Sequence, residues 1–370
     1  MGNIGFNSRA FVQSLSVLGS VVAQKSPIPA FSNVCITVAS GDSCQMLASD
    51  GDMWLSVRTP LLYGEVGMCF CVDALDFLKV LRNLDDVSVE LRVDSDATTL
   101  TCVHPTGHFT LPCFDGHEFP KPLDLSDDLV GDETVRLSDF GRVVDSVRFC
   151  TANETLRPVL NGVFVVFNQN GLLAVATDGN RLARRIDASV AVSGDFSFIL
   201  PKKAITALLA LASDCDVHIR LDGKAVEFEC YDFRMCARLI EGRYPNFASV
   251  IPTDDGNPIE LDRNCLVASL RRVMPFGNSE SQLVVLTFSD GELAVETRDD
   301  DFNKSGREQM PCTYKGDSLS IGFKNSSLID VASNVQGDTV TMELWDATHS
   351  SVIHGGNRGE YLSLLMPMLL

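Results

Sequence analysis

The sequence lacks any long apolar run, although hydrophobic residues make up 45% of its 370 residues. No stretch approaches the roughly 20 consecutive apolar residues that a helix needs to cross a bilayer. The first residues, MGNIGFNSRAFVQSL, contain no basic segment followed by an apolar one, so we expect no secretory signal peptide. Gly2 resembles a myristoylation start, but Phe6 stands where that motif requires Ser or Thr. We therefore expect a cytoplasmic protein without a membrane partner.

Motifs for metal binding and catalysis are also missing. The twelve cysteines include no CxxC pair and are scattered through a long chain, so we expect free thiols. The densest group of candidate metal ligands is Cys102, His104, His108, Cys113 and His117. Their sequence spacings match no common zinc-binding module. There is no nucleophile elbow, phosphate-binding glycine loop, HExxH helix or zinc-deaminase signature. We predict no metal, no cofactor and no catalytic residue.

Positive charge is scarce, because 30 basic residues face 49 acidic ones and the net charge is −19. Such a balance argues against an outer surface that nucleic acid coats. It still allows a protein whose few basic residues gather on one face.

What the sequence does contain is a weak internal repeat with a period of 120–130 residues. GLLAVAT at 171–177 matches GELAVET at 291–297, and residues 44–51 form a related segment. Three alternating strands follow helix-like segments at nearly constant offset; they are residues 87–91, 217–221 and 340–344.

Each repeat also carries two helical patterns. The opening helices are predicted to follow polar caps at Ser8, Ser138 and Asp262. The second helices show the apolar spacing of a one-sided helix: Ala74, Phe77, Leu78 and Leu81; Ile205, Leu208, Leu209 and Ala212; Leu328, Val331, Ala332 and Val335. Hairpin turns are predicted at Asn170-Gly171, Asp222-Gly223 and Asp290-Gly291.

These patterns predict an α+β fold of three repeated domains, each with two helices on one face of antiparallel sheet. Acidic, turn-rich joints at 123–134 and 251–261 mark the boundaries. The predicted domains are 1–127, 128–253 and 254–370.

Four motifs on this scaffold resemble one known family. LRPVLNGVFV (156–165), VATDGNRLA (175–183), IEGRYPNFASVIP (240–252) and the final LMPML are similar to the bacterial DNA sliding clamp, the beta subunit of DNA polymerase III. The resemblance covers the whole chain and implies clamp-type domains in a ring-forming head-to-tail dimer. Such a homodimer encircles double-stranded DNA and acts as a processivity factor in DNA replication. The implied partners are the clamp loader, the replicative DNA polymerase and other proteins with a clamp-binding motif.

The resemblance implies that basic residues in or beside the helices line the hole for DNA. The candidates are Arg9, Lys25, Lys79, Arg82, Arg142, Arg148, Lys202, Lys203, Arg271, Arg272 and Lys324. Each of them could equally be a solvated charge on a helix surface. The second helix of the first repeat departs from the family, since Asp73 and Asp76 flank stretches where we expect more positive charge.

The last ten residues, YLSLLMPMLL, could be a buried final strand or an apolar surface for a partner. The resemblance favours the second, since the family captures short peptides in a groove that the terminal residues help to form. The groove residues it implies are Arg157, Leu160, Thr177, Gly179, Asn180, Arg181, Leu182, Pro245, Val250, Ser351, Leu364, Leu365, Met366, Pro367 and Met368. Ser249 and Leu369 replace arginines that are usual in the family, which suggests a preference for more apolar motifs.

For the dimer interface, the resemblance implies Phe109 and Leu111 of one copy against Met274, Pro275 and Phe276 of the other. These residues could instead be local core. Head-to-tail pairing is heterologous, and it closes at two copies only if each spans half a circle.

Two alternatives from other classes remain open. A polar catalytic cluster of Asp178, Asn180 and Arg181 would make the protein an enzyme, although a turn capped by Asp178 explains these residues better. The second alternative is a divergent clamp relative that is not loaded onto DNA and acts only as a protein-binding hub.

Overall fold

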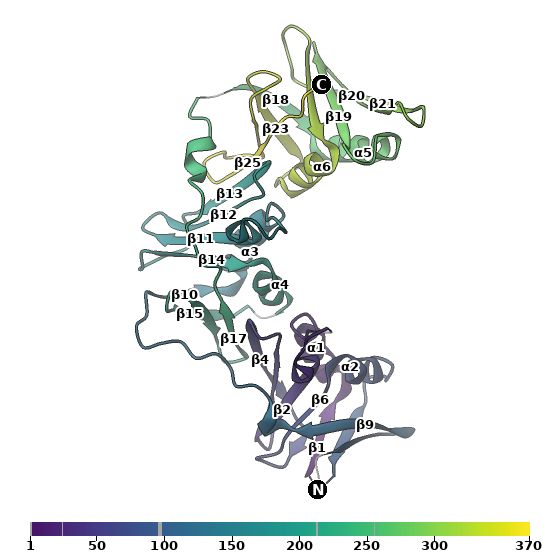
Figure 1. The fold of residues 1–370 in the computed structure, drawn as a ribbon, viewed down its shortest axis with the longest axis vertical. Helices are drawn as coiled ribbons and strands as arrows, with labels where there is room; N and C mark the ends of the chain where they lie inside the picture. Colours follow the sequence, from purple (N-terminus) through teal and green to yellow (C-terminus); the bar gives the residue numbers. More distant parts are fainter. Residues whose placement is uncertain (1, 24, 95–97, 212–213, 255) are drawn as a thin grey trace. The chain divides into compact units, whose positions relative to one another are not determined.

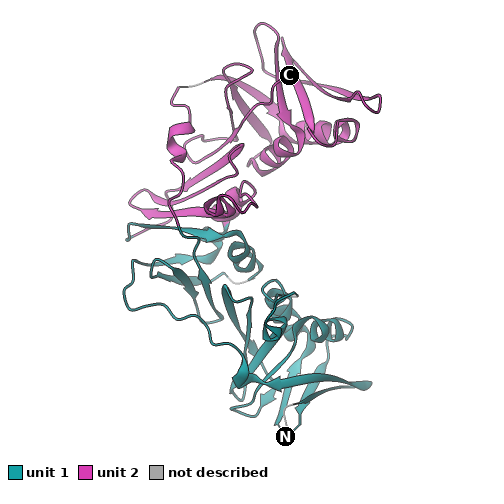
Figure 2. Ribbon diagram, viewed as in Figure 1, with its two compact units in different colours: residues 1–141, 193–241 teal, residues 142–192, 242–370 magenta. Residues whose placement is uncertain are grey.

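The computed structural model describes residues 2–23, 25–94, 98–211, 214–254 and 256–370 (Figure 1). It divides into two compact units, residues 1–141 with 193–241 and residues 142–192 with 242–370 (Figure 2). Both units take part of the middle sequence repeat, so the predicted domain boundaries are not the boundaries of these units.

Unit 1 contains one antiparallel sheet of thirteen strands in the order β10-β15-β16-β17-β4-β3-β2-β6-β9-β8-β7-β1-β5 among the described residues. Its strands are β1 (Gly2–Asn7), β2 (Asn33–Ser40), β3 (Ser43–Ser49), β4 (Met53–Pro60), β5 (Tyr63–Gly64), β6 (Cys69–Asp73), β7 (Ser88–Val93), β8 (Thr99–His104), β9 (Gly107–Asp115), β10 (Gly131–Arg136), β15 (Asp216–Leu221), β16 (Ala225–Glu229) and β17 (Phe233–Arg238). The strand β14 (Phe196–Pro201) and the helices α1 (Ser8–Leu18), α2 (Ala74–Arg82) and α4 (Lys202–Ala210) also belong to this unit. β17 pairs with β4, so the sheet runs on from the first sequence repeat into the second.

Within the described part of unit 2 there is a run of seven paired strands, β11-β12-β13-β25-β24-β23-β18, and a four-stranded sheet, β21-β20-β19-β22. Its strands are β11 (Gly162–Asn168), β12 (Gly171–Thr177), β13 (Arg181–Asp187), β18 (Asn257–Asp262), β19 (Leu283–Ser289), β20 (Glu292–Asp299), β21 (Lys304–Pro311), β22 (Leu319–Lys324), β23 (Thr339–Leu344), β24 (Ser351–His354) and β25 (Tyr361–Leu365). Its helices are α5 (Arg263–Val273) and α6 (Asn325–Asn334), and α3 (Leu137–Arg148) has residues in both units.

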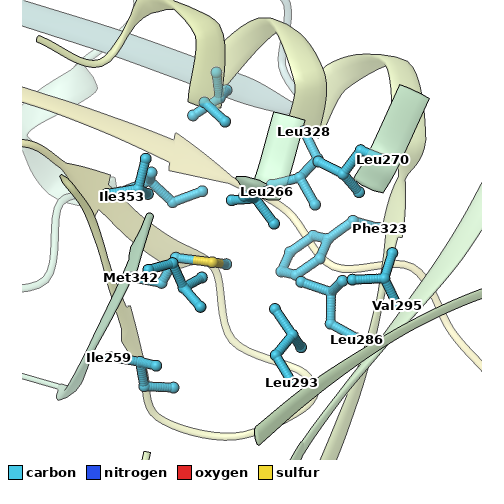
Figure 3. Close-up of a cluster of buried hydrophobic side chains, with 14 of the residues drawn as sticks. Ile259, Leu266, Leu270, Leu286, Leu293, Val295, Phe323, Leu328, Met342 and Ile353 are labelled. Carbon is cyan, nitrogen blue, oxygen red and sulfur yellow. The ribbon is translucent and has the colours of Figure 1, made fainter. Parts of the chain in front are cut away.

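The core of the third repeat shows how the helices and sheets pack together. Leu266 and Leu270 of α5 and Leu328 of α6 face Phe323 of β22 and Met342 of β23 (Figure 3). All five side chains are fully buried. The predicted arrangement, two amphipathic helices against antiparallel sheet, is therefore the arrangement of this repeat.

Of the three predicted N-terminal helix caps, one is confirmed and two are wrong. Asp262 caps α5 as predicted, since its Oδ1 accepts a hydrogen bond from the Cys265 amide at 2.7 Å. The prediction for Ser8 is wrong, because Asn7 caps α1 and the Ser8 hydroxyl donates instead to the Asp85 carbonyl. The prediction for Ser138 is wrong as well, because α3 begins one residue earlier. A polar residue within the first turn can satisfy other backbone groups, so sequence alone misplaces the cap by one position.

The second helices and the hairpins match their predictions closely. α2, α4 and α6 carry the predicted apolar positions, apart from Val335, which caps α6, and Ala212, which lies outside the described residues. The hairpin glycines Gly171, Gly223 and Gly291 all have positive φ, the conformation that glycine adopts without a steric penalty.

The C-terminal segment divides into two parts. Residues 361–365 form β25, which pairs with β13 and β24 and is buried throughout. Beyond it, Met366 is 49% exposed and Leu369 is 91% exposed. The Met368 amide donates to the Gly322 carbonyl at 2.8 Å, and a Cβ at Gly322 would come within 3.0 Å of the Met368 carbonyl oxygen. The tail is thus a core strand followed by an exposed apolar end.

Candidate functional site: an apolar cavity beside the C-terminal strand

A cavity of about 200 Å³ lies in unit 2 where several segments distant in sequence meet. Its lining residues are Arg157, Leu160, Thr177, Gly179, Asn180, Arg181, Leu182, Pro245, Asn246, Phe247, Val250, Ser350, Leu364 and Met366. Most of this lining is apolar, so the cavity suits hydrophobic side chains that arrive from outside.

The base of the cavity comes from paired strands. Leu182 on β13 lies directly opposite Leu364 on β25, and both side chains are almost fully buried. Leu160 enters from a single 3₁₀ turn, Pro158–Asn161, and is 2% exposed. These three leucines form a floor whose position depends on the sheet register.

The turn between β12 and β13 forms a rigid rim. The Thr177 hydroxyl donates to the Arg181 carbonyl at 2.7 Å, and the Asp178 carboxylate accepts from the amides of Asn180 and Arg181 at 2.9 and 3.0 Å. The predicted cap of this turn by Asp178 is confirmed. Gly179 has φ +93°, and the Asn180 carbonyl accepts the Met366 amide at 2.9 Å, which attaches the tail to the rim.

The remaining wall is the segment 244–250. Tyr244 is buried, its ring stacks on Phe164 at 4.9 Å between centroids, and its hydroxyl donates to the Val175 carbonyl. Burial raises the pKa of the Tyr244 phenol above its ordinary value, so it remains a neutral donor. This anchor holds Pro245 and Val250, which is 55% exposed, at the cavity mouth.

Arg181 is the most constrained cation of the lining. Its guanidinium donates to Asp178 at 3.0 Å, to Asp330 at 2.7 Å and to the Phe149 carbonyl at 3.0 Å. Burial works against its charge, yet these partners, Asp330 foremost, raise the pKa of Arg181 above its ordinary value. Because two carboxylates already pair with it, Arg181 shapes the cavity more than it attracts acidic ligands.

Eleven of the fifteen residues predicted for the groove line this cavity. The other four do not line it: Ser351, Leu365, Pro367 and Met368. Leu365 belongs to the core of the third repeat and faces Ser351 across the strand pair. Neighbouring residues on a strand point to opposite faces, so Leu364 of β25 lines the cavity while Leu365 does not. Ser350, which precedes β24, lines the cavity, and Ser351, the first residue of β24, does not.

Three lining residues were missed by sequence reasoning: Asn246, Phe247 and Ser350. Asn246 and Phe247 lie inside the motif at 240–252 that carries the resemblance, so that motif contained the signal. Ser350 precedes β24, so only the folded chain decides that it, rather than its neighbour Ser351, lines the cavity.

Five of the eleven basic residues predicted to face DNA already pair with carboxylates. Lys79 pairs with Asp76 at 2.9 Å, and Arg142 pairs with Asp187 at 2.8 Å. Further pairs are Arg148 with Asp145, Lys203 with Asp50, and Arg272 with Glu308. Arg82 donates to the Ser16 hydroxyl at 3.0 Å. The Asp73 carboxylate, which seemed to weaken a basic face, caps α2 through the amides of Leu75 and Asp76.

The other six cations have no ion pair among the described residues, and one of them, Arg82, bonds a hydroxyl instead. The remaining five are Arg9, Lys25, Lys202, Arg271 and Lys324, all of which are exposed. If any of the predicted cations reach phosphates without first breaking an ion pair, they are these.

The residues predicted for the dimer interface are at the surface of their own units. Phe109 of β9 is 39% exposed and stacks on His104, and Leu111 is half-buried. Met274, Pro275 and Phe276 form an exposed 3₁₀ turn after α5. Residues 107–112 of β9 pair only with β8, and β21 pairs only with β20, among the described strands. Each unit thus presents an open strand edge next to these apolar side chains.

The cysteines and histidines considered as metal ligands are dispersed. All twelve cysteines are among the described residues and are free thiols. Cys102 is buried in β8, whereas His117 pairs with Asp115 at 2.7 Å, an interaction that raises the pKa of His117. In the described ranges no three His, Cys, Asp or Glu side chains lie where they could hold a metal ion. None of the described helices is long and apolar enough to cross a membrane.

Comparison with known proteins defines the class of this fold. Sequence models of three domains of the DNA polymerase III beta subunit match in order: the N-terminal domain at residues 3–124, the central domain at 134–246 and the C-terminal domain at 248–369. The chain therefore has a three-domain clamp fold of helices and antiparallel sheets.

Relatives and solved structures identify the family. The chain is 26% identical over 365 residues to the beta sliding clamp of Pseudomonas aeruginosa, covering 98% of both, and 27% identical to that of Chlamydia muridarum, covering 97% of this chain and 99% of the other. The structure of a sliding clamp from Bartonella birtlesii bound to griselimycin is similar with a TM-score of 0.90, 27% identity and full coverage of both chains. A Caulobacter crescentus clamp with polyethylene glycol bound to a putative beta-motif tethering region is similar with a TM-score of 0.87 and 25% identity, covering 100% of this chain and 99% of that one.

The chain belongs to the bacterial DNA sliding clamp family, the beta subunits of DNA polymerase III. It is accordingly a DNA polymerase processivity factor. The alternative, a relative that serves only as a protein-binding hub, is not favoured by these comparisons.

Proposed function

We propose that this chain promotes processive DNA synthesis by forming a head-to-tail homodimeric ring around duplex DNA and by capturing partner peptides in the cavity beside β25. The clamp performs no chemistry of its own, and it works with the replication machinery in the cytoplasm. Its partners are the clamp loader, the replicative polymerase and other proteins that carry a short apolar motif. Loader and polymerase compete for the same cavity.

The observation that carries this proposal is the cavity itself. Its floor is preformed, because strand pairing positions Leu182 and Leu364 and a 3₁₀ turn positions Leu160, and its mouth is bordered by half-exposed apolar side chains. An apolar pocket of this kind accepts Leu and Phe side chains, and a flexible methionine in the wall adapts to different motifs. Met366 supplies that methionine.

Ring closure rests on the open strand edges of β9 and β21. Phe109 beside one edge and Phe276 beside the other are exposed aromatic residues, which are common in the buried centre of interfaces. A second copy that joins these edges would bury them and remove two strand edges that otherwise invite aggregation.

The contact with DNA needs only to be weak, since a closed ring is held by topology. Exposed cations without an ion pair, such as Lys25, Lys202 and Arg271, would meet phosphates without sequence preference. An acidic exterior would discourage DNA from binding elsewhere, in keeping with the net charge of −19.

The test is a titration of a fluorescent peptide of the Gln-Leu-x-Leu-Phe type against the full-length protein. Met366→Ala removes a cavity wall, so we expect binding to weaken about five- to tenfold, as loss of one apolar side chain implies. Leu369→Ala is the matched control, because Leu369 is also in the exposed tail but outside the cavity lining. It should change affinity less than about twofold.

Equal binding by the Met366→Ala protein and the unaltered protein would place the peptide site elsewhere. The ring is tested separately: the protein should remain on closed circular DNA after loading by its cognate loader and dissociate when the circle is cut. A protein that binds the peptide but is never retained on the circle would support the hub alternative.

A further inference from the structure

The apolar cavity does not end at Val250 and Ser350. These two residues also line a second hollow, of about 440 Å³, so the two cavities share a border within unit 2. The other residues of this second hollow, which we term the extension, are Ser249, Ile251, Pro252, Asp254, Trp345, Asp346 and His349. A peptide that fills the first cavity and continues past Val250 would enter the extension.

The chemistry of the extension differs from that of the apolar cavity. It places one aromatic ring, Trp345, beside two carboxylates, Asp254 and Asp346. The Trp345 indole N–H donates to Asp254 Oδ2 at 3.0 Å, and this bond fixes both the ring and the carboxylate. An aromatic face next to carboxylates is the combination that binds guanidinium and ammonium groups.

Several hydrogen-bond donors stabilise the charged form of the Asp346 carboxylate. Its carboxylate accepts hydrogen bonds from the amides of Thr348 and His349 at 2.7 and 2.9 Å, from the Thr348 hydroxyl, and lies 2.6 Å from His349 Nδ1. These donors, the Thr348 amide first, hold the pKa of Asp346 far below its usual range. The hydrogen bonds also lock the loop 346–349 in place, so the charge has a defined position.

The cations near the extension do not cancel its negative charge. Arg358 donates to the Pro252 carbonyl at 2.7 Å, but its guanidinium also pairs with the buried Glu343 at 2.7 Å. His349, which is exposed and lines the extension, can also carry positive charge. With its Nδ1 hydrogen-bonded to Asp346, a neutral His349 presents Nε2 as a further acceptor.

We propose that the extension binds an arginine or lysine that flanks the apolar motif of a partner peptide. This inference rests on the proposed function, because it assigns a further specificity to the same peptide site. The apolar motif would occupy the first cavity, and the basic side chain would lie against Trp345 with its charged end at Asp254 and Asp346. Partners with a basic flank would then be preferred over partners with the same motif and a neutral flank.

The experiment compares three fluorescent peptides with one apolar motif: two arginines before it, two arginines after it, or alanines at all four positions. Each is titrated by anisotropy against the full-length protein at about 0.15 M salt, where exposed charges farther apart than a Debye length are screened. The buffer is held at about pH 8, above the range in which histidines ordinarily titrate. We expect one arginine peptide to bind about five- to tenfold more tightly than the alanine peptide.

The critical variant is Asp254→Asn with Asp346→Asn. Asparagine retains an acceptor for the Trp345 indole and for the loop amides, so the extension keeps its shape while it loses two charges. The matched control is Asp290→Asn with Asp301→Asn, which removes two exposed charges outside the lining of either cavity. The advantage of the arginine peptide should fall to less than about twofold in the first variant and persist in the control.

The outcomes separate this inference from the proposed function. Equal affinity for all three peptides on the unaltered protein would overturn the inference but leave the apolar cavity as the peptide site. An arginine advantage lost equally in both variants would also overturn it, since net charge alone would then explain the preference. No binding of any peptide would instead contradict the proposed function.

Discussion

The apolar cavity and the set of basic helix residues differ in how much of their chemistry is available to a partner. In the cavity, Leu160, Leu182 and Met366 face a hollow that nothing in the described chain fills. Among the cations, Lys79 and Arg272 already contact carboxylates of their own neighbourhood. The cavity is open for binding, whereas five of the eleven cations are already neutralised by carboxylates.

This difference suits a ring that must hold proteins firmly and DNA loosely. Affinity for a peptide comes from apolar surface that is removed from water, which the cavity offers at once. Affinity for DNA comes from cations that replace counterions on phosphates, and a cation held by a carboxylate must first leave it. A clamp in which five of these eleven cations are already paired holds phosphates with fewer free charges and can slide with less resistance.

Among variants that test this difference between the two regions, we expect the largest effect from replacing Arg181. This cavity residue stabilises the fold through its ion pairs. Arg181→Ala leaves the carboxylates of Asp178 and Asp330 and the Phe149 carbonyl without their shared donor. We expect the free energy of unfolding to fall by about 2 kcal/mol, less than for a fully buried pair because Asp330 is half exposed. Urea unfolding measures this.

The control for Arg181 is Arg157→Ala, which alters a lining arginine whose side chain is 56% exposed. It should change the free energy of unfolding by less than about 0.5 kcal/mol. If both variants were equally stable, Arg181 would be free to serve ligands and the contrast between the two regions would weaken.

A second, intermediate effect concerns DNA. Replacing Lys25, Lys202 and Arg271 by Gln removes exposed cations that have no ion pair among the described residues. If each contacts a phosphate, the slope of log affinity against log salt should decrease by about 1 per residue. The salt dependence of binding to duplex DNA measures this slope.

The comparison variant removes whole ion pairs: Lys79→Gln with Asp76→Asn, and Arg272→Gln with Glu308→Gln. Its net charge is unchanged, and we expect its salt slope to stay within about 0.5 of the original. A large loss in this variant would mean that the pairs open to contact DNA.

The smallest effect should come from freeing a single paired cation. Arg272 contacts Glu308 at 2.6 Å, and this hydrogen bond holds the pKa of the Glu308 carboxyl below its ordinary value of 4.5. Glu308→Gln should release Arg272 and strengthen DNA binding about twofold. Glu292→Gln, which removes an equal charge from a carboxylate bonded to Gln309, should have less effect.

The same pair makes a prediction about pH with a definite sign. Because the pKa of Glu308 is lowered in the folded state, its stabilising effect is complete above the ordinary value and is lost as the pH falls through the lowered one. The difference in urea midpoint between the original protein and Glu308→Gln should therefore be constant from about pH 6 to 8 and vanish in stronger acid. A difference that grew in acid would contradict the assignment.

Sequence patterns predicted the repeated α+β fold because its signals are local. The one-sided helix that contains Phe77 and Leu81 and the turn at Gly171 depend on residues a few positions apart. Helix starts were less predictable, as Asn7 and Leu137 show, because a cap depends on which backbone group a side chain reaches.

For the site, the sequence itself determined the composition of the cavity. The motifs at 156–165, 175–183 and 240–252 and the apolar tail contain nearly all the lining residues. Tertiary structure decided which of two neighbours faces inward, since the register between β13 and β25 turns Leu364 to the cavity and Leu365 to the core.

Tertiary structure alone also decided which charges are available. Lys203 meets Asp50, and Arg181 meets Asp330, across sequence separations that no local pattern encodes. Apolar periodicity is a property of single segments, whereas an ion pair or a shared cavity border exists only where distant segments meet. The sequence by itself therefore determined the repeats and the kind of surface, and folding determined which of its groups are left for a partner.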